Sequence, residues 1–270
     1  MSATEAPAGI IGDLDAGRIR VAYPDPDAPS GWRVDSAVQQ AILGLFANRE
    51  TRTWDLGGAM QFRDRVGLPV KDLLDSAEAQ AALAAGKPWR VVPGGTSVRA
   101  GAYLAPGVTI MPPSFINVGA WVGEGTMVDS HVLVGSCAQI GARVHMSAGV
   151  QIGGVLEPPG RRPVIVEDEV FVGAQAALLE GVLVRKGAVI AAGVVLTGTS
   201  RLYDLVRETV IVGTLDEPLA VPAGAVVVPG VRQVGGEFAA ANGIALSTAV
   251  IVKYRDERTD ARVALEEALR

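Results

Sequence analysis

The stretch GAYLAPGVTIMPPSFINVGAWVGEGTMVDSHVLVGSCAQIGARVHMSAGVQIGG, residues 101–154, decides the fold, because an aliphatic residue or methionine recurs in it at every sixth position. The same phase extends back to Val92, is interrupted at LEPPGRRP (156–163), and resumes from Val166 to Leu196. The 17 members of the series are Val92, Val98, Leu104, Ile110, Ile116, Val122, Val128, Val134, Ile140, Met146, Ile152, Val166, Val172, Leu178, Val184, Ile190 and Leu196. This regularity indicates a repeated structural unit.

A period of six is neither the helical period nor the simple alternation of a long strand. The position four residues after each aliphatic residue is usually small or β-branched, and Gly, Asn and Asp gather just after the aliphatic residue, where a bend needs a permissive backbone. Three short strands and three bends would close a triangular coil of about 18 residues, so the 17 hexads would form between five and six coils. We therefore expect a mainly β protein, a parallel β-helix whose narrow core explains why aromatic residues are only 5% of the chain.

Composition and charge exclude several classes of protein. Of the 270 residues 49% are hydrophobic, which excludes extensive disorder, yet no apolar run approaches the roughly 18 residues of a membrane helix. The net charge of −5, without a basic stripe, argues against a nucleic-acid or membrane surface. The two histidines and single cysteine show no metal-ligand spacing, so no metal site is expected. The lone Cys137 and the acidic N-terminus, which lacks a signal pattern, predict a cytoplasmic protein.

The hexads divide the chain into three parts. We expect a mostly helical N-terminal domain over 1–88, the β-helix over 89–230, and a C-terminal extension over 231–270. Expected within them are helices over 36–48, 72–85 and 259–270 and a strand over 249–254. We also expect loop excursions near 157–165 and 202–219, the second either a loop or an extra hairpin, and one more coil-like segment over 220–228. The last helix would cap the open end of the stack.

Four segments carry a more specific resemblance: RVVPGG (90–95), GTMVDS (125–130), VGSCAQIG (134–141) and GGVLEP (153–158). With them the chain resembles the tetrahydrodipicolinate N-succinyltransferases, a family of hexapeptide-repeat acyltransferases. The resemblance implies a left-handed β-helix, acyl-CoA as co-substrate with no tightly bound cofactor, a homotrimer with active sites between subunits, and succinyl transfer to an amino dicarboxylate of the diaminopimelate and lysine pathway.

The resemblance also assigns roles to residues of this chain. Arg90 would bind a substrate carboxylate, because a guanidinium donates two parallel hydrogen bonds to it. Asp129 would hold and orient the attacking amine. Gln175 and Glu180 are further candidates for substrate binding. The pantetheine arm of CoA would lie along coil edges where small residues permit close approach of the backbone, at Gly154, Ala174, Ala191 and Gly193.

The chain departs from the family pattern at the acceptor site. The family usually has Arg-Ser-Glu where Gln175, Ala176 and Ala177 stand, and Thr-Trp where Ser130 and His131 follow Asp129. We expect His131 to act as a catalytic acid–base group in place of the missing glutamate. Two alternatives stay open. One is an acetyl-CoA-dependent acyltransferase of secondary metabolism, similar to the tabtoxin-pathway enzyme. The other is a β-helix that binds or supports a partner without catalysis.

Overall fold

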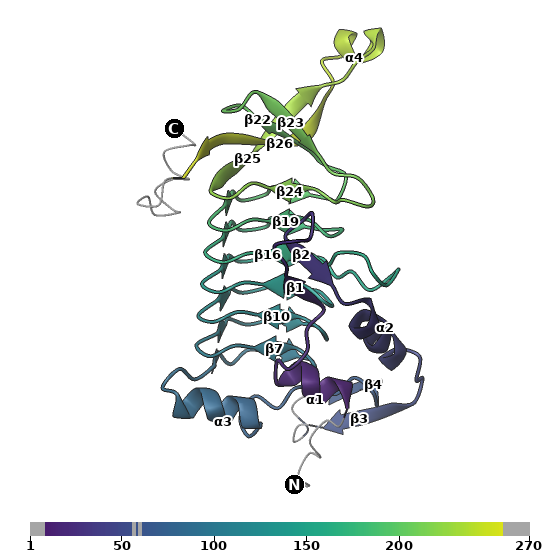
Figure 1. The fold of residues 1–270 in the computed structure, drawn as a ribbon, viewed down its shortest axis with the longest axis vertical. Coiled ribbons are helices and arrows are strands. Elements are labelled where there is room, and N and C mark those ends of the chain that lie inside the picture. The colour runs from purple at the N-terminus through teal and green to yellow at the C-terminus, as the bar shows by residue number, and fades with distance from the viewer. Residues whose placement is uncertain (1–8, 56–57, 59–60, 256–270) are drawn as a thin grey trace.

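The computed structural model describes residues 9–55, 58 and 61–255 of the chain. Its body is a stack of three-sided coils with short strands on each side (Figure 1). Strands of successive coils pair in parallel with an offset of 18 residues, as Val122 does with Ile140. The protein is therefore a parallel β-helix, and this architecture agrees with the left-handed β-helix implied by the resemblance.

Each side of the stack is one sheet, and the following names are used for the three sides. Face 1 contains β7 (Tyr103–Leu104), β10 (Trp121–Val122), β13 (Gln139–Ile140), β16 (Ile165–Val166), β19 (Leu183–Val184) and β24 (Ala220–Val221). Face 2 contains β5 (Arg90–Val91), β8 (Thr109–Ile110), β11 (Met127–Val128), β14 (His145–Met146), β17 (Phe171–Val172), β20 (Val189–Ile190) and the start of β25 (Ala225–Gln233). Face 3 contains β6 (Ser97–Val98), β9 (Phe115–Ile116), β12 (Leu133–Val134), β15 (Gln151–Ile152), β18 (Ala177–Leu178) and β21 (Val195–Leu196).

The bends between faces are named corners. Corner 1–2 comprises residues 105–108, 123–126, 141–144, 167–170 and 185–188. Corner 2–3 comprises residues 111–114, 129–132, 147–150, 173–176 and 191–194. Corner 3–1 comprises residues 99–102, 117–120, 135–138, 179–182 and the longer connection 153–164.

The predicted ladder forms the core from Val98 onward. Every member from Val98 to Leu196 is buried, with at most 2% of its surface exposed. The prediction of Val92 as the first member of the ladder is wrong, because Val91 rather than Val92 pairs with Ile110 in face 2. The step from Val91 to Val98 is seven residues, and the bend between them contains Gly94 and Gly95 at φ values of 144° and 92°. An additional residue in this first bend thus shifts the phase by one.

The N-terminal region mixes helices with hairpins. Its elements are α1 (Ile10–Asp15), β1 (Ala22–Pro24), β2 (Trp32–Val34), α2 (Ser36–Leu45), β3 (Thr51–Asp55), β4 (Gln61–Arg65) and α3 (Ala77–Ala84). Two predicted helices are present in shorter form as α2 and α3, which begin where the side chains of Asp35 and Ser76 accept backbone N–H groups. The helix α1 and the hairpins β1–β2 and β3–β4 were not predicted from the sequence.

This region covers one side of the stack (Figure 1). The β1–β2 hairpin lies on face 1, where Ala22 packs on Ile165 and Leu183. Next to corner 3–1, Ile42 of α2 is packed in a cluster with Val118 and Cys137. In contrast, His131 and Gln175 of corner 2–3 are exposed. Corner 2–3 is thus open to solvent in the single chain.

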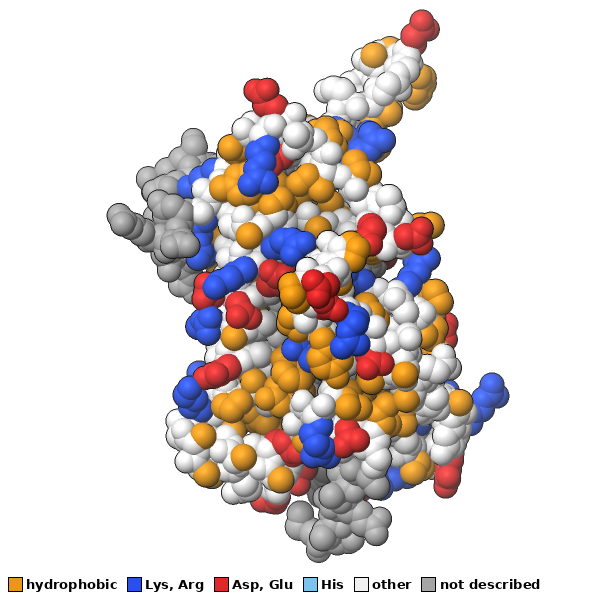
Figure 2. All heavy atoms as spheres, viewed as in Figure 1, with side chains coloured by type: hydrophobic (Ala, Val, Ile, Leu, Met, Phe, Trp, Pro, Cys, Tyr) orange, Lys and Arg blue, Asp and Glu red, His pale blue; other side chains and the backbone are white. Residues whose placement is uncertain are grey.

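The C-terminal part closes the top of the stack and then leaves it. The excursion over 202–219 begins as a hairpin of β22 (Arg201–Asp204) and β23 (Thr209–Val212), and the coil-like segment over 220–228 is present as β24 and the start of β25. β25 pairs with β26 (Ala245–Tyr254), whose second half is the predicted strand, and the two carry α4 (Glu237–Ala241) on an arm that projects from the body (Figures 1 and 2). The domain boundary at residue 230 falls inside β25, and the helix expected over 259–270 lies outside the described residues.

Candidate active site

Corner 2–3 brings together most of the residues singled out in the sequence. The coil repeat places Asp129, Gly173 and Ala191 in one vertical column and His131, Gly149, Gln175 and Gly193 in a second. The N–H groups of the second column bond the coil below, for example His131 to the Pro113 carbonyl at 2.6 Å and Gly193 to the Ala174 carbonyl at 2.9 Å. The four members of this column have φ between 60° and 75°, so two of them, His131 and Gln175, are non-glycine residues in the left-handed region.

Asp129 offers a carboxylate at the start of this corner. Its Oδ1 accepts the Ser130 N–H at 2.7 Å, while its backbone carbonyl accepts the Ser114 hydroxyl at 2.8 Å. Among the described residues no group donates to Oδ2, and Asp129 is half-buried. This oxygen is therefore available to an amine. No hydrogen bond joins the Asp129 and His131 side chains within the described part of the chain.

Arg90 lies on the same side of the molecule but lower in the stack. It is exposed on β5, which is separated from β11 by the single strand β8. With about 4.8 Å between neighbouring strands, Arg90 and Met127 are roughly 10 Å apart along the stack. An elongated ligand could therefore contact both Arg90 and the corner that begins at Asp129.

Two predicted site residues lie elsewhere. Gly154 and Glu180 both line a hollow of about 320 Å³ at corner 3–1, between the connection 153–164 and residues 215–218. The carboxylate of Glu180 accepts the Gly198 N–H at 3.3 Å. Within one chain the structure therefore separates Gly154 and Glu180 from Asp129. Counting hexads forward from Leu178 of face 3 would have assigned Glu180 to this other corner.

The predicted CoA-contacting residues differ in access. An added Cβ at Gly193 would meet no atom within 4 Å, so its backbone faces open space. Ala174 is half-buried beside it, whereas Ala191 is only 2% exposed as a whole residue and packs in the core. The Ala191 N–H donates to the Val227 carbonyl and its own carbonyl accepts the Val194 N–H, so within the single chain neither its methyl nor its backbone is open to a ligand.

Sequence reasoning missed two features near this site. The first is a hollow of about 700 Å³ at the base of the stack, lined by the bend after Arg90 together with Trp54, Phe62 and Phe115. The buried hydroxyl of Thr96 in this bend has no hydrogen-bond partner among the described residues. The second is Gln151, whose amide contacts corner 2–3. Alternation of side chains along β15 was the signal that could have indicated its outward position.

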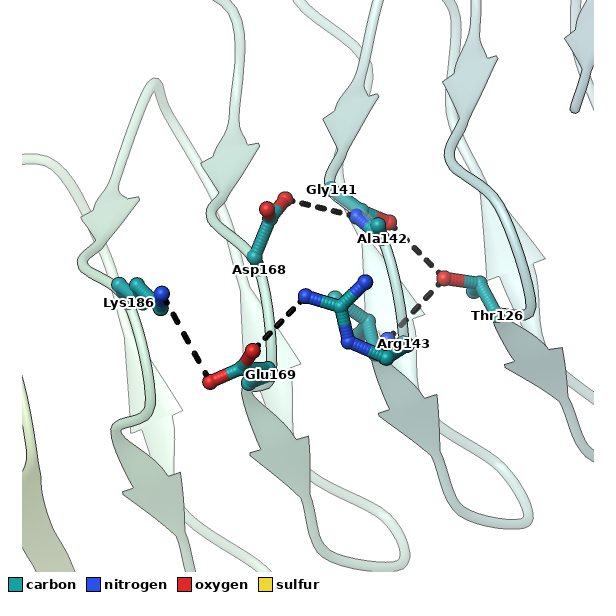
Figure 3. Close-up of polar contacts among 8 residues, drawn as sticks. Thr126, Gly141, Ala142, Arg143, Asp168, Glu169 and Lys186 are labelled. Atoms are coloured by element: carbon teal, nitrogen blue, oxygen red, sulfur yellow. Dashed lines mark hydrogen bonds and ion pairs between the residues drawn. The ribbon is translucent and has the colours of Figure 1, made fainter. Parts of the chain in front are cut away.

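Corner 1–2, in contrast, carries charges that neutralise one another (Figure 3). Arg143 lies 2.7 Å from Glu169, which also lies 3.8 Å from Lys186. The hydrogen bond from Arg143 lowers the pKa of Glu169, and the same bond raises the pKa of Arg143. Asp168 accepts the Ala142 N–H at 2.8 Å, so its carboxylate is used within the fold. The charged side chains of corner 1–2 are thus paired with one another or with the backbone, whereas Asp129 of corner 2–3 keeps a carboxylate oxygen available to a ligand.

The described residues contain no group of three or more His, Cys, Asp or Glu side chains that could hold a metal ion. The same part of the chain contains no helix that is long and apolar enough to cross a membrane.

The relatives found by comparison with known proteins carry the same enzyme name as one another. A family profile for the hexapeptide repeat of succinyl-transferase matches residues 163–198. A 2,3,4,5-tetrahydropyridine-2,6-dicarboxylate N-succinyltransferase of Idiomarina loihiensis is 41% identical over 268 residues, which cover 98% of this chain and 89% of the relative. One from Afipia carboxidovorans is 42% identical over 258 residues, covering 95% and 86% of the two chains.

A solved structure supports the fold. It is a Campylobacter jejuni protein described as a 2,3,4,5-tetrahydropyridine-2-carboxylate N-succinyltransferase, with a TM-score of 0.50 and 15% identity. The match covers 96% of this chain and 62% of that one, so this chain spans less than two thirds of it.

Proposed function

Because the chain belongs to the 2,3,4,5-tetrahydropyridine-2,6-dicarboxylate N-succinyltransferase family, we propose that it transfers a succinyl group from succinyl-CoA to tetrahydrodipicolinate or a related amino dicarboxylate. This is the reaction type of diaminopimelate and lysine synthesis. The observation that carries the proposal is 41% identity over 98% of the chain to a relative with this name. Use of a CoA thioester and the lone cysteine support a cytoplasmic location, which stays a prediction.

The proposed reaction is direct acyl transfer. The amine of the ring-opened acceptor attacks the thioester carbonyl carbon, a C–N bond forms, the C–S bond breaks, and CoA leaves as a thiolate that takes up a proton. Asp129 holds the amine through its free carboxylate oxygen and stabilises the positive charge that develops on nitrogen. Arg90, exposed lower on face 2, binds an acceptor carboxylate.

His131 is the proposed proton acceptor. Its ring is exposed at the same corner as Asp129, two residues further along the chain, and a histidine exchanges protons near neutral pH. Gln175, which is exposed one column position above Gly149, contacts the acceptor through its amide. A backbone N–H at the coil corner would stabilise the oxyanion.

The CoA arm is proposed to lie along corner 2–3. The support is the open space at Gly193 and the small side chain of Ala174. Gly154 and Glu180 would join this site only from a neighbouring subunit, because within one chain they lie at corner 3–1.

We therefore infer a homotrimer in which corner 2–3 of one subunit faces corner 3–1 of the next. Such an arrangement would unite the two sets of predicted residues. Multi-angle light scattering should give a mass of about three chains of 27.9 kDa. A fully active monomer would contradict the trimer without contradicting the reaction.

One observation favours a second candidate, acetyl transfer to a related intermediate in a tabtoxin-like pathway. Gln175, Ala176 and Ala177 depart from the Arg-Ser-Glu pattern that the resemblance leads one to expect at the acceptor site. A change of acceptor or acyl chain length would be the physical consequence of losing two charges there.

Release of free CoA tests both candidates. The purified protein is assayed with succinyl-CoA and acetyl-CoA against tetrahydrodipicolinate and 2-aminopimelate, with Asp129→Asn as the matched inactive variant. Succinyl-CoA turnover is the expected result, and faster acetyl-CoA turnover would support the second candidate. If neither thioester binds in isothermal titration, the β-helix is a non-catalytic scaffold and both proposals fail.

A further inference from the structure

The side chain of Gln151 donates hydrogen bonds to two backbone carbonyls of corner 2–3. Gln151 faces outward on β15, and its Nε2 donates to the Gly149 carbonyl at 3.1 Å and to the His131 carbonyl at 3.4 Å. These two carbonyls belong to successive coils. One side-chain amide therefore ties the corner of one coil to the corner below it.

His131 needs such support because of its backbone. Its φ of 61° lies in the left-handed region, which costs a non-glycine residue energy and persists only where the surroundings fix it. The coil below supplies one restraint, since the His131 N–H donates to the Pro113 carbonyl. The Gln151 amide supplies the other restraint, on the His131 carbonyl. Both backbone groups of His131 are thus held.

The space around Gly149 completes the arrangement. The Gln175 side chain lies against Gly149, since a Cβ added there would come within 2.2 Å of Gln175 Nε2. Gly149 is therefore enclosed by the amides of Gln151 and Gln175. On face 3, Gln151 pairs with Leu133 below and Ala177 above, and neither of these side chains can hydrogen-bond to it.

We propose that Gln151 is a positioning residue that holds the His131 backbone, and with it the point from which the imidazole projects, at the reacting edge of the coil. The proposal rests on the proposed role of His131 in acyl transfer. It goes beyond that role by assigning the geometry of the histidine to a side chain of the next coil.

The charged surroundings of His131 are simple. Within its own corner the charged side chain is Asp129. The neighbouring coils contribute residues 111–114 and 147–151 at this corner, none of which is charged. Because Asp129 is the charged side chain already at this corner, a charge introduced at position 151 should be the one change in the electrostatic surroundings of His131.

The experiment compares Gln151→Ala, Gln151→Glu and the conservative Gln151→Asn. Gln151→Ala should lower kcat about 10-fold or more while the acceptor KM changes less than 2-fold, because binding by Arg90 and Asp129 is untouched. Gln151→Glu should move the acid limb of the pH–rate profile to higher pH, since its carboxylate favours the protonated imidazole. Gln151→Asn should recover part of the lost kcat.

Gln80→Ala is the matched control, because the amide N–H of Gln80 also donates to a backbone carbonyl, that of Leu74 on the surface.

A second readout does not depend on activity. The chain has only two histidines, so the ring C–H signal of His131 can be assigned by NMR with His131→Asn. Its titration midpoint should rise in Gln151→Glu and stay constant in Gln80→Ala. Unchanged kcat, pH profile and titration in all Gln151 variants would overturn the proposal. Absence of CoA release by the wild-type protein would overturn the proposed function instead, and the NMR titration would still test the positioning.

Discussion

Lys71 and Asp15 form a buried ion pair, with 2.5 Å between Nζ and Oδ1 and only 1% and 9% of the two side chains exposed. Asp15 ends α1, and its carboxylate also accepts the Gly101 N–H of corner 3–1 at 2.8 Å. The pair thus fastens the N-terminal region to the first coils. Burial raises the pKa of Asp15 above its ordinary value of 3.8, although Lys71 and Gly101 act in the opposite direction.

We expect Lys71→Met to lower the free energy of unfolding by about 3–5 kcal/mol at neutral pH, because it leaves a buried carboxylate without its partner. The loss should shrink at low pH. A raised Asp15 pKa means that the folded state keeps the proton, so the stability of this variant falls as pH rises through that pKa. Urea unfolding between about pH 4 and 8 measures this dependence. Lys87→Met is the control, since Lys87 and Glu124 form an exposed pair that is worth about 0–1 kcal/mol.

Inward-facing and outward-facing positions of face 3 should respond differently to a new charge. Ile116→Asp or Val134→Asp places a carboxylate at a position that is 0% exposed, with no partner. A cost of several kcal/mol should abolish soluble protein. Val195 lies on the same face, but its side chain points outward and the residue is 57% exposed. The melting temperature and yield of Val195→Asp should therefore stay near those of the wild type. Equal behaviour of the inward and outward variants would contradict the register.

Cys137 reports whether α2 stays in place. The thiol belongs to corner 3–1 and is buried against α2, and this burial raises its pKa to about 12. It should react with a thiol reagent at pH 8 only after unfolding. Because the unfolded thiol loses its proton near pH 9, the folded state loses stability as pH rises from about 9 to 12, and Cys137→Ala should remove this component. Rapid labelling of the native protein would show that this corner opens.

At the candidate site, Asp129→Asn should lower kcat by about 10²-fold or more, and His131→Ala by about 10-fold with a flatter pH profile between about 6 and 8. The affinity for the acyl-CoA donor should be nearly unchanged in both. Glu124→Gln at corner 1–2 is the control. If His131→Ala keeps full activity and the same profile, Asp129 acts without the histidine.

The sequence was sufficient for the core because one aliphatic side chain per hexad is a local requirement. It was insufficient at Val91, where a bend of irregular length precedes the regular coils, and counting back from Val98 selects the wrong valine. The β3–β4 hairpin escaped prediction because TRTWD and QFRDR lack a buried face that would impose an alternating pattern. The exposed corner column of His131 and Gln175 followed from the repeat, whereas the role of Gln151 depended on side-chain contacts between coils.

The connection 153–164 has a consequence for how the stack tolerates changes of length. Val166 pairs with Ile140 across an offset of 26 residues, where regular coils have 18, yet β16 continues face 1 without displacement. Residues inserted at a corner thus form a loop that projects from the side of the stack, and the strands after the insertion keep their pairing with the coil below. Removal of one strand with its bend would instead rotate everything beyond it by a third of a turn, and would carry Gln175 away from the edge that holds Asp129. Within the coils, the shortest deletion that preserves this edge is one full revolution.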